Sequence, residues 1–228
     1  QAAYLPEGGG LDLMAALNDP ALANIALVSS FGAESAVLLH LVSQVRPRMP
    51  VIFLDTGRHF PATLDYVDTL EQHLGLNVLR VCPEASFIAG EDPDESLAKR
   101  DPDMCCNLRK TFPLADALAG YGAWISGRKR FQASSRAAIP VFERDGDKIK
   151  LNPLALWSKA EVDAYRARHA LPAHPLEQFG FLSIGCEPCT RAVAEGEDAR
   201  AGRWAHVPDK QECGIHLGPD GRWVRNKS

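Results

Sequence analysis

The stretch N-I-A-L-V-S-S-F-G-A-E-S-A-V-L-L, residues 24–39, places an apolar run directly before a turn of small residues and a second apolar segment. A short apolar run bounded by turn residues predicts a buried strand over residues 24–30. From residue 34 to about residue 45, apolar side chains recur at the spacing of one helix face. A strand that leads through a tight turn into a helix is the beginning of a βαβ unit.

The same alternation continues along the first half of the chain. Residues 50–55 predict a second apolar strand, and residues 61–74 predict a helix that opens with proline and ends near Gly75. Residues 77–82 predict a third strand and residues 123–126 a fourth. Strands that alternate with helices favour a mainly parallel sheet with helices on both faces, so we expect an α/β fold.

Three later segments predict further elements. Residues 101–119 have a helical pattern interrupted at Pro113, and residues 140–151 predict a hairpin around a D-G turn. The S-K-A-E pattern at residues 158–161 is a capping box, which predicts a helix to about residue 170.

Length, composition and charge limit the class of protein. The chain has 228 residues, 46% of them hydrophobic, and a formal net charge of -4. We expect one domain over residues 1–204, followed by a mobile C-terminal tail over residues 205–228. The negative charge argues against general nucleic-acid binding, whereas clustered basic residues favour a small anionic ligand; scattered, solvated charges are the alternative. An apolar run of roughly 18 residues or a signal segment is not found, so we expect neither membrane insertion nor export.

Four of the six cysteines occur in two compact motifs, Cys105-Cys106 and Cys186-Glu187-Pro188-Cys189. Adjacent cysteines suit a disulfide poorly because neighbouring side chains diverge along the backbone. Four thiolates from two segments can instead enclose one soft metal centre. Zinc and an iron–sulfur cluster both accept four cysteines, and the spacing does not separate them.

The two remaining cysteines have different surroundings. Cys213 lies beside glycine near the end of the chain, outside the proposed metal site, and is a candidate nucleophile. We expect Cys82 to be an ordinary buried thiol at the end of a strand. Unpaired thiols predict a reducing compartment, the cytoplasm.

Two loops follow predicted strands and are candidates for ligand binding. The small-residue turn at residues 29–35 exposes backbone N–H groups at a helix N-terminus, which favours a phosphate or similar oxyanion; a plain tight turn is the alternative. The side chains and backbone expected to contact the ligand there are those of Ser30, Phe31, Gly32 and Ser35. The second loop, L-D-T-G-R-H-F-P at residues 54–61, lies where open α/β sheets bind ligands. Its candidate binding residues are Asp55, Thr56 and Gly57, although capping of the next helix explains Asp55 equally well.

Further motifs complete a pattern that spans most of the chain. They are C-C-N-L-R-K (105–110), G-R-K-R-F-Q (127–132), G-C-E-P-C-T-R (185–191) and E-C-G-I-H-L (212–217). Together with the two loops, they resemble the assimilatory sulfonucleotide reductases, which reduce adenosine 5′-phosphosulfate (APS) or its 3′-phosphorylated form (PAPS) to sulfite. The resemblance implies an adenine-nucleotide α-hydrolase-like fold, in which the first loop is a modified pyrophosphatase-type (PP) loop.

The resemblance also implies roles for individual residues. Members of this family with both cysteine motifs hold a [4Fe-4S] cluster and mostly use APS, so Cys105, Cys106, Cys186 and Cys189 are the implied ligands. Cys213 is the implied nucleophile, with thioredoxin or glutaredoxin as electron donor and a homo-oligomer as the common assembly. His216 is implied to assist the Cys213 thiolate, although a structural contact explains it as well.

Cationic side chains are expected to hold the phosphosulfate of the substrate. The implied catalytic cations are Lys129, Arg200 and Arg203, and the additional substrate-binding candidates are Arg128 and Arg191. For each of them, an exposed surface charge is the alternative.

Three other functions remain open at this point. One is a PAPS reductase of the same family, although the cluster-free PAPS reductases lack both cysteine motifs. A PP-loop ATP pyrophosphatase, such as an adenylyltransferase or a tRNA-thiolating enzyme, explains the first loop and four cysteines but not E-C-G-I-H-L. A zinc-stabilised nucleotide-binding or redox-sensing module explains the cysteines but not the basic residues.

Overall fold

The computed structural model describes residues 13–207 and residues 210, 212 and 215, so the predicted roles of Cys213 and His216 lie outside the described residues. The described chain forms one six-stranded sheet in the order β3-β2-β1-β4-β6-β5. Its strands are β1 (Ile25–Val28), β2 (Pro50–Leu54), β3 (Asn77–Val81), β4 (Ala123–Ser126), β5 (Phe142–Asp145) and β6 (Lys148–Leu151). All neighbouring strands are parallel except β5, which pairs antiparallel with β6 at one edge. The expected mainly parallel sheet is confirmed.

Strand β1 lies in the middle of the sheet and determines where a ligand can enter. It pairs with β2 through Leu27 and Val51 and with β4 through Leu27 and Ile125. The chain moves from β1 outward to β2 and β3, then returns to place β4 on the other side of β1. The loops after β1 and β4 therefore diverge at the carboxyl ends of their strands, which is where open α/β sheets form a ligand crevice.

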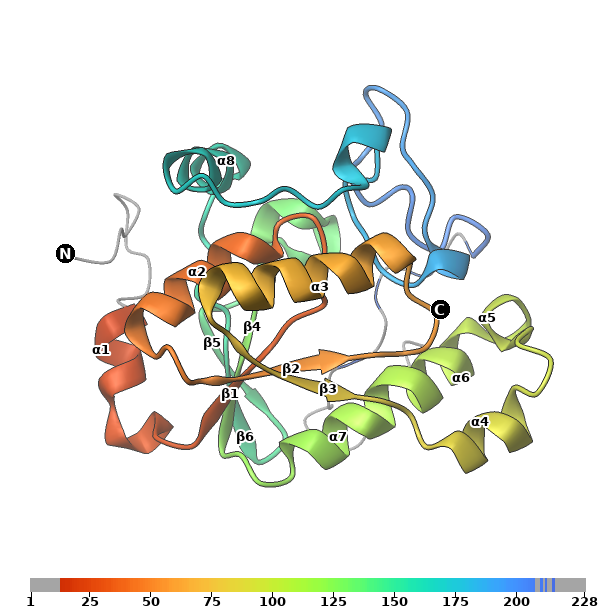
Figure 1. The fold of residues 1–228 in the computed structure, drawn as a ribbon, viewed down its shortest axis with the longest axis horizontal. Helices are drawn as coiled ribbons and strands as arrows, with labels where there is room; N and C mark the ends of the chain where they lie inside the picture. Colours follow the sequence, from red (N-terminus) through yellow and green to blue (C-terminus); the bar gives the residue numbers. More distant parts are fainter. Residues whose placement is uncertain (1–12, 208–209, 211, 213–214, 216–228) are drawn as a thin grey trace.

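Helices cover both faces of the sheet (Figure 1). One face buries the larger apolar cluster, to which α1 (Leu13–Asn18), α2 (Ser35–Val45), α3 (Pro61–Leu74) and α8 (Lys159–Arg168) contribute. The opposite face packs against α7 (Phe112–Leu118) through Leu114 and Leu118, which contact the cluster of Ala26, Ile52 and Trp124. Three short helices, α4 (Ala85–Glu91), α5 (Leu97–Arg100) and α6 (Pro102–Cys106), lead from β3 to α7.

Local signals place several element boundaries as expected. Helix α3 ends at Gly75, whose φ of 62° is a left-handed conformation that glycine adopts without strain. At the start of α8, Ser158 and Glu161 each accept a hydrogen bond from the other's backbone N–H, which confirms the capping box. The predicted hairpin is β5 and β6, and Gly146 turns between them with a φ of 66°.

The helix that carries the adjacent cysteines contains a wider turn. Residues Asn107–Thr111 form a π-helical turn between α6 and α7, in which the Phe112 N–H donates to the carbonyl of Asn107. Pro113 lacks an N–H and its ring would clash with the carbonyl of Arg109, four residues earlier, so the turn widens to relieve that clash. The predicted interruption is therefore a widened turn before Pro113 rather than a break in the helix.

The prediction for Cys82 is wrong, because its side chain is exposed. It follows β3, an edge strand on which exposed residues outnumber partly buried ones.

The segment after the C-x-x-C motif packs closely against that motif. Trp204 is buried, and its backbone N–H donates to the carbonyl of Cys189 at 3.0 Å. In the part of the chain that the structure describes, every helix is too short or too polar to cross a membrane.

Candidate active site

A cavity of about 230 Å³ lies at the carboxyl ends of β1 and β4. Its walls come from the loop after β1, the loop after β4, and two later segments at residues 182–185 and 200–204. Glu212 and Ile215 also line it. The cavity therefore brings together segments from nearly the whole length of the chain.

The loop after β1 forms one wall largely through its backbone. A Cβ at Gly32 would lie 3.2 Å from the carbonyl oxygen of Ile184, so a larger residue would require the two segments to move slightly apart. Ser30, Gly32 and Ser35, which were expected to contact a ligand, line the cavity. Phe31 does not: its φ is 48°, its N–H donates to Ser29 Oγ at 3.1 Å, and its ring packs edge-on against Phe53 in the core. Phe31 therefore fixes the loop from beneath.

Cationic side chains outnumber carboxylates on the cavity wall. The lining cations are Lys110, Arg128, Lys129, Arg136, Arg200 and Arg203, and the lining carboxylates are Glu34 and Glu212. An excess of positive charge in a partly enclosed site attracts an anionic ligand strongly, because the surrounding protein screens charges less than water does.

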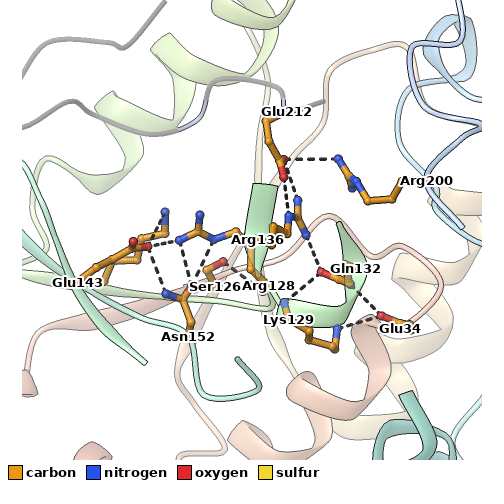
Figure 2. Close-up of polar contacts among 11 residues, drawn as sticks. Glu34, Ser126, Arg128, Lys129, Gln132, Arg136, Glu143, Asn152, Arg200 and Glu212 are labelled. Atoms are coloured by element: carbon orange, nitrogen blue, oxygen red, sulfur yellow. Dashed lines mark hydrogen bonds and ion pairs between the residues drawn. The ribbon is translucent and has the colours of Figure 1, made fainter. Parts of the chain in front are cut away.

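Lys129 is the most deeply buried of these cations. Its Nζ donates to the carbonyl of Gly127 at 3.0 Å and lies 3.2 Å from Glu34 Oε2. Burial lowers the Lys129 pKa, and the neighbouring Glu34 opposes that effect. Beside it, Arg128 is held by Glu143 and by Asn152 at the end of β6 (Figure 2).

Arg203 has the least engaged side chain among these cations. Its guanidinium lies 4.4 Å from the centre of the Trp204 ring and so close to Gly185 that a Cβ there would clash. Its Nε is buried and finds no hydrogen-bond partner among the described residues. An anion that enters the cavity can therefore meet a guanidinium that is stacked in place and forms no ion pair with a described carboxylate.

Two other arginines of the cavity bind a carboxylate from the end of the chain. Arg136 donates from Nε and Nη2 to Glu212 at 2.5 and 2.7 Å, and Arg200 Nη2 lies 3.4 Å from the same group (Figure 2). Burial alone would raise the Glu212 pKa, but the hydrogen bonds and charge of Arg136 outweigh burial and lower it. Glu212 directly precedes Cys213 in the sequence.

The four cysteines of the two motifs are all buried, and Gly185, which directly precedes Cys186, lines the cavity. Cys105 and Cys106 lie on α6, whereas Cys186 directly precedes the single turn Glu187–Cys189 and Cys189 ends it. Burial raises the Cys105 pKa to about 11, and the nearby Cys186 and Cys189 add to that shift. The structure therefore brings together two motifs that are distant in the sequence.

The first part of the loop after β2, residues 55–57, faces these cysteines rather than the cavity. Thr56 Oγ1 lies 3.3 Å from Cys186 Sγ, and the Glu187 N–H donates to the carbonyl of Arg58 at 2.8 Å. Asp55 accepts a hydrogen bond from the Gly57 N–H at 3.1 Å and so stabilises its own loop. None of Asp55, Thr56 and Gly57 lines the cavity, whereas His59, which the sequence did not single out, does.

A buried ion pair connects the cysteine helix to the loop after β2. Arg109 Nη2 donates to Asp92 Oδ2 at 2.7 Å, with side-chain exposures of 5% and 1%, and Arg109 Nη1 donates to the carbonyl of Thr56 at 2.9 Å. Asp92 also accepts from the Leu97 N–H at 2.8 Å. The sequence contains no local signal for this pair, because the residues belong to different elements.

The buried cysteines differ in arrangement from a site for a single metal ion. Within the described residues, no three His, Cys, Asp or Glu side chains converge on a position for one metal ion. A four-iron cluster binds each cysteine through a different iron, so its ligands lie farther apart than those of a single zinc ion. Burial raises the Cys105 pKa to about 11 and also raises the Cys189 pKa. At Cys186, burial is outweighed by the charge of Lys110, the hydrogen bond with Thr56 and the charge of Arg203, which together lower the pKa. Of these three thiols, Cys186 is therefore the one whose surroundings favour the thiolate that a cluster ligand needs. The four buried thiols therefore fit an iron–sulfur cluster.

Two residues depart from the sequence prediction in opposite ways. Arg191 is 48% exposed, forms an ion pair with Glu197 at 3.0 Å and does not line the cavity. Lys110 lines the cavity and lowers the pKa of Cys186, although only its motif had been noted. Its position four residues after Cys106 was the available signal.

Comparison with known proteins gives consistent results. Residues 24–192 match the phosphoadenosine phosphosulfate reductase domain. The chain is 53% identical over 194 residues to "Adenosine 5'-phosphosulfate reductase" of Chelativorans sp. (strain BNC1), covering 85% of this chain and 79% of that protein. It is 45% identical over 187 residues to the protein of the same name from Streptomyces coelicolor, covering 80% and 78%.

Solved structures share the fold. The phosphoadenylyl-sulfate (PAPS) reductase from Candida auris, solved as a phosphate complex, aligns with a TM-score of 0.65 and 29% identity over 76% of this chain and 84% of that one. Candida glabrata FMN adenylyltransferase, at 16% identity and a TM-score of 0.51 over 72% and 52%, shares the fold alone. The chain therefore has the expected adenine-nucleotide α-hydrolase-like (PP-loop) fold.

Proposed function

Since this chain belongs to the phosphoadenosine phosphosulfate reductase domain family, we propose that it reduces APS to sulfite and AMP in assimilatory sulfate reduction. One observation carries the proposal. Cationic side chains line a cavity at the end of β1, and the same cavity is lined by residues on both sides of Cys213, namely Glu212 and Ile215. The names of the similar proteins support APS as the substrate.

Different residues of the cavity are suited to the two parts of the substrate, the nucleotide and the phosphosulfate. The turn of small residues at Ser30, Gly32 and Ser35 leaves backbone room for the nucleotide phosphate at the start of α2. We assign the phosphosulfate to Lys129, Arg200 and Arg203, whose charge-assisted hydrogen bonds would stabilise negative charge as a second anion approaches. Arg128 would contribute charge while remaining bound to Glu143.

The proposed reaction has two half-reactions at Cys213. The Cys213 thiolate attacks the sulfur of APS, a sulfur–sulfur bond forms, and the bond to the bridging oxygen breaks so that AMP leaves with that electron pair. A thiolate of thioredoxin or glutaredoxin then attacks the Cys213 sulfur and releases sulfite, and the donor's second thiol closes a disulfide that frees Cys213. We assign His216 to assistance of the Cys213 thiolate.

Cys105, Cys106, Cys186 and Cys189 would hold the proposed [4Fe-4S] cluster. When bound, the cluster supplies charge next to the cavity and a link between α6 and the C-x-x-C turn. Lys110 supports this arrangement, because it lines the cavity and also lowers the pKa of Cys186.

We extend the proposal to organisation and location. Residues 1–204 form the reductase domain and residues 205–228 form the tail that brings Cys213 to the substrate and then to the donor. The family resemblance supports a homo-oligomer, and a thiol-based mechanism supports the reducing cytoplasm.

The decisive experiment is a single turnover without reductant. Anaerobic protein mixed with APS should release about one AMP per site and gain the mass of a sulfite group on the Cys213 peptide, as covalent catalysis in two steps requires. Cys213→Ser should retain iron and bind AMP but form no adduct. Turnover by that variant, or an adduct on Cys82, would contradict the proposal, and a higher kcat/KM for PAPS than for APS would contradict the substrate assignment.

A further inference from the structure

The carboxylate of Glu212 is held tightly at one side of the cavity. Arg136 contacts both of its oxygens, from Nε at 2.5 Å and from Nη2 at 2.7 Å, and the two side chains are only 12% and 15% exposed. A two-point arginine–carboxylate contact of this kind restricts direction as well as distance. The Glu212 carboxylate is therefore held in place more firmly than a single surface ion pair would hold it.

Arg136 is itself held in place by a chain of polar contacts (Figure 2). Its Nη1 donates to Gln132 Oε1 at 2.5 Å, and Gln132 Nε2 donates to Glu34 Oε2 at 2.8 Å. Lys129 joins the same chain, through its N–H to Gln132 Oε1 at 3.1 Å and its Nζ to Glu34. Glu34 lies at the start of α2, so these contacts connect the end of the chain to the loop after β1.

A second contact holds the chain on the other side of Cys213. Ile215 packs against the apolar cluster beneath the sheet that includes Leu54 and Trp124. Glu212 and Ile215 are three positions apart, one with a polar anchor and the other with an apolar one, and both line the cavity. Cys213 directly follows Glu212 in the sequence, and consecutive Cα atoms are about 3.8 Å apart, so the Arg136 contact acts on the residue next to Cys213.

The arginines of the cavity therefore differ in how they are engaged. All three side-chain nitrogens of Arg136 donate to protein acceptors, whereas Arg203 has a buried Nε with no described partner. Arg136 is thus committed to Glu212 and Gln132, while Arg203 remains available to an anion. Arg200 is intermediate, because its contact with Glu212 is longer, at 3.4 Å.

We propose that Arg136 and Glu212 form a positioning clamp, which fixes the chain beside Cys213 at the cavity so that its thiol meets the sulfur of the bound substrate. This inference rests on the proposed function and assigns two residues to it. Neither residue is catalytic in this role, because they act through the position of Cys213. The clamp is expected to govern the rate of adduct formation and to leave nucleotide affinity nearly unchanged.

The test compares three variants in the same single turnover with APS and no reductant. Glu212→Gln keeps the size and one acceptor but loses the charge, Arg136→Met removes the guanidinium, and the third variant combines them. Each single variant should slow AMP release at saturating APS roughly tenfold or more, as expected when a charge-assisted hydrogen bond is lost. The dissociation constant for AMP should change by less than about twofold, and the double variant should be no slower than the slower single variant, since both disrupt one contact.

Matched controls come from the exposed pair Arg191 and Glu197, which lies outside the cavity. Arg191→Met and Glu197→Gln should leave both the AMP release rate and the AMP affinity unchanged. Iron content and far-UV circular dichroism show that each variant is folded. If Arg136→Met does not fold, the conservative Glu212→Gln variant decides the question.

Three results would overturn the clamp. Unchanged rates in the single variants would show that the contact does not position Cys213. Weaker AMP or APS binding with an unchanged saturating rate would make Arg136 a substrate-binding residue, and multiplying effects in the double variant would show that the two residues act separately. A wild-type protein that releases no AMP would refute the proposed function, whereas a wild-type adduct with equally fast variants would refute the clamp alone.

Discussion

The loops after β1 and β2 leave neighbouring parallel strands at the same edge of the sheet, yet they face different groups. The first lines the cavity with Ser30, Gly32 and Ser35. The second turns toward the cysteines, where Thr56 contacts Cys186. Both loops satisfy the general expectation for ligand binding at strand ends, so that expectation alone does not assign a ligand.

The difference comes from what packs against each loop. Gly32 lets the segment at Ile184 approach the first loop, which closes the cavity around it. In the second loop, the carbonyl of Thr56 is already bonded to Arg109, and the carbonyl of Arg58 is bonded to Glu187. The second loop therefore supports the cysteine motifs, and the first is left open to a nucleotide.

The largest expected effect, a loss of stability, comes from breaking the buried Arg109–Asp92 ion pair that supports the second loop. Arg109→Leu would leave the carboxylate of Asp92 buried without its partner, and loss of one member of a buried pair costs about 3–5 kcal/mol of stability. The free energy of unfolding, measured by urea denaturation, should fall by that amount, and iron content should fall with it.

The double variant Arg109→Leu/Asp92→Leu serves as the control for that prediction. Replacing both charges by apolar groups removes the unpaired carboxylate and should recover part of the lost stability. If Arg109→Leu retains wild-type stability and iron, the second loop does not depend on this pair, and the contrast between the two loops is weakened.

The second prediction concerns the pH dependence of stability that arises from His174, which contacts α3, the helix that follows the second loop. His174 is buried, its Nδ1 accepts from the Leu176 N–H at 3.2 Å, and its Nε2 lies 3.1 Å from Thr63 Oγ1 on α3. Burial lowers the His174 pKa from 6.5 to about 4, so the folded state favours the neutral ring. The stabilisation is present above pH 6.5 and is lost as the pH falls toward 4, with a total of about 3 kcal/mol.

The measurement for this prediction is urea denaturation at a series of pH values between 7.5 and 4. His174→Gln can still accept from Leu176 and donate to Thr63 but does not titrate, so it should lose less stability in acid than the wild type. Equal losses in the two proteins would show that His174 is not the group responsible.

The smallest effect is expected at a single cation of the first loop's cavity. Arg203→Ala should lower kcat/KM for APS roughly tenfold or more, since a charge-assisted hydrogen bond contributes about 1.5–3 kcal/mol. Iron content should remain that of the wild type, because Lys110, whose charge affects the Cys186 pKa more than that of Arg203 does, is retained. An unchanged iron content would separate the role of the cavity from that of the cysteine motifs. Arg191→Ala, outside the cavity, is the matched control and should have wild-type kinetics; equal kinetics in Arg203→Ala would make Arg203 structural.

Sequence patterns predicted the helices and strands well because each pattern acts over a few residues. The proline that opens α3, the glycine that ends it and the capping box of α8 all act through backbone groups within one turn. The same local logic misjudged Cys82, because burial of a strand end depends on whether the strand lies at the edge of the sheet. It also gave no sign that Thr56 lies against Cys186 and that Asp55, Thr56 and Gly57 do not line the cavity, since the position of a loop after a strand does not reveal its neighbours.

The sequence by itself determined the alternating strands and helices, the two cysteine motifs and the supply of basic residues, because periodicity and residue chemistry are local properties. Only the tertiary structure decided which groups meet. Thr56 and Cys186 are 130 residues apart, and Arg136 and Glu212 are 76 apart. Contacts over such separations arise from the order of strands in the sheet and from the packing of later segments over their ends, which no short pattern encodes.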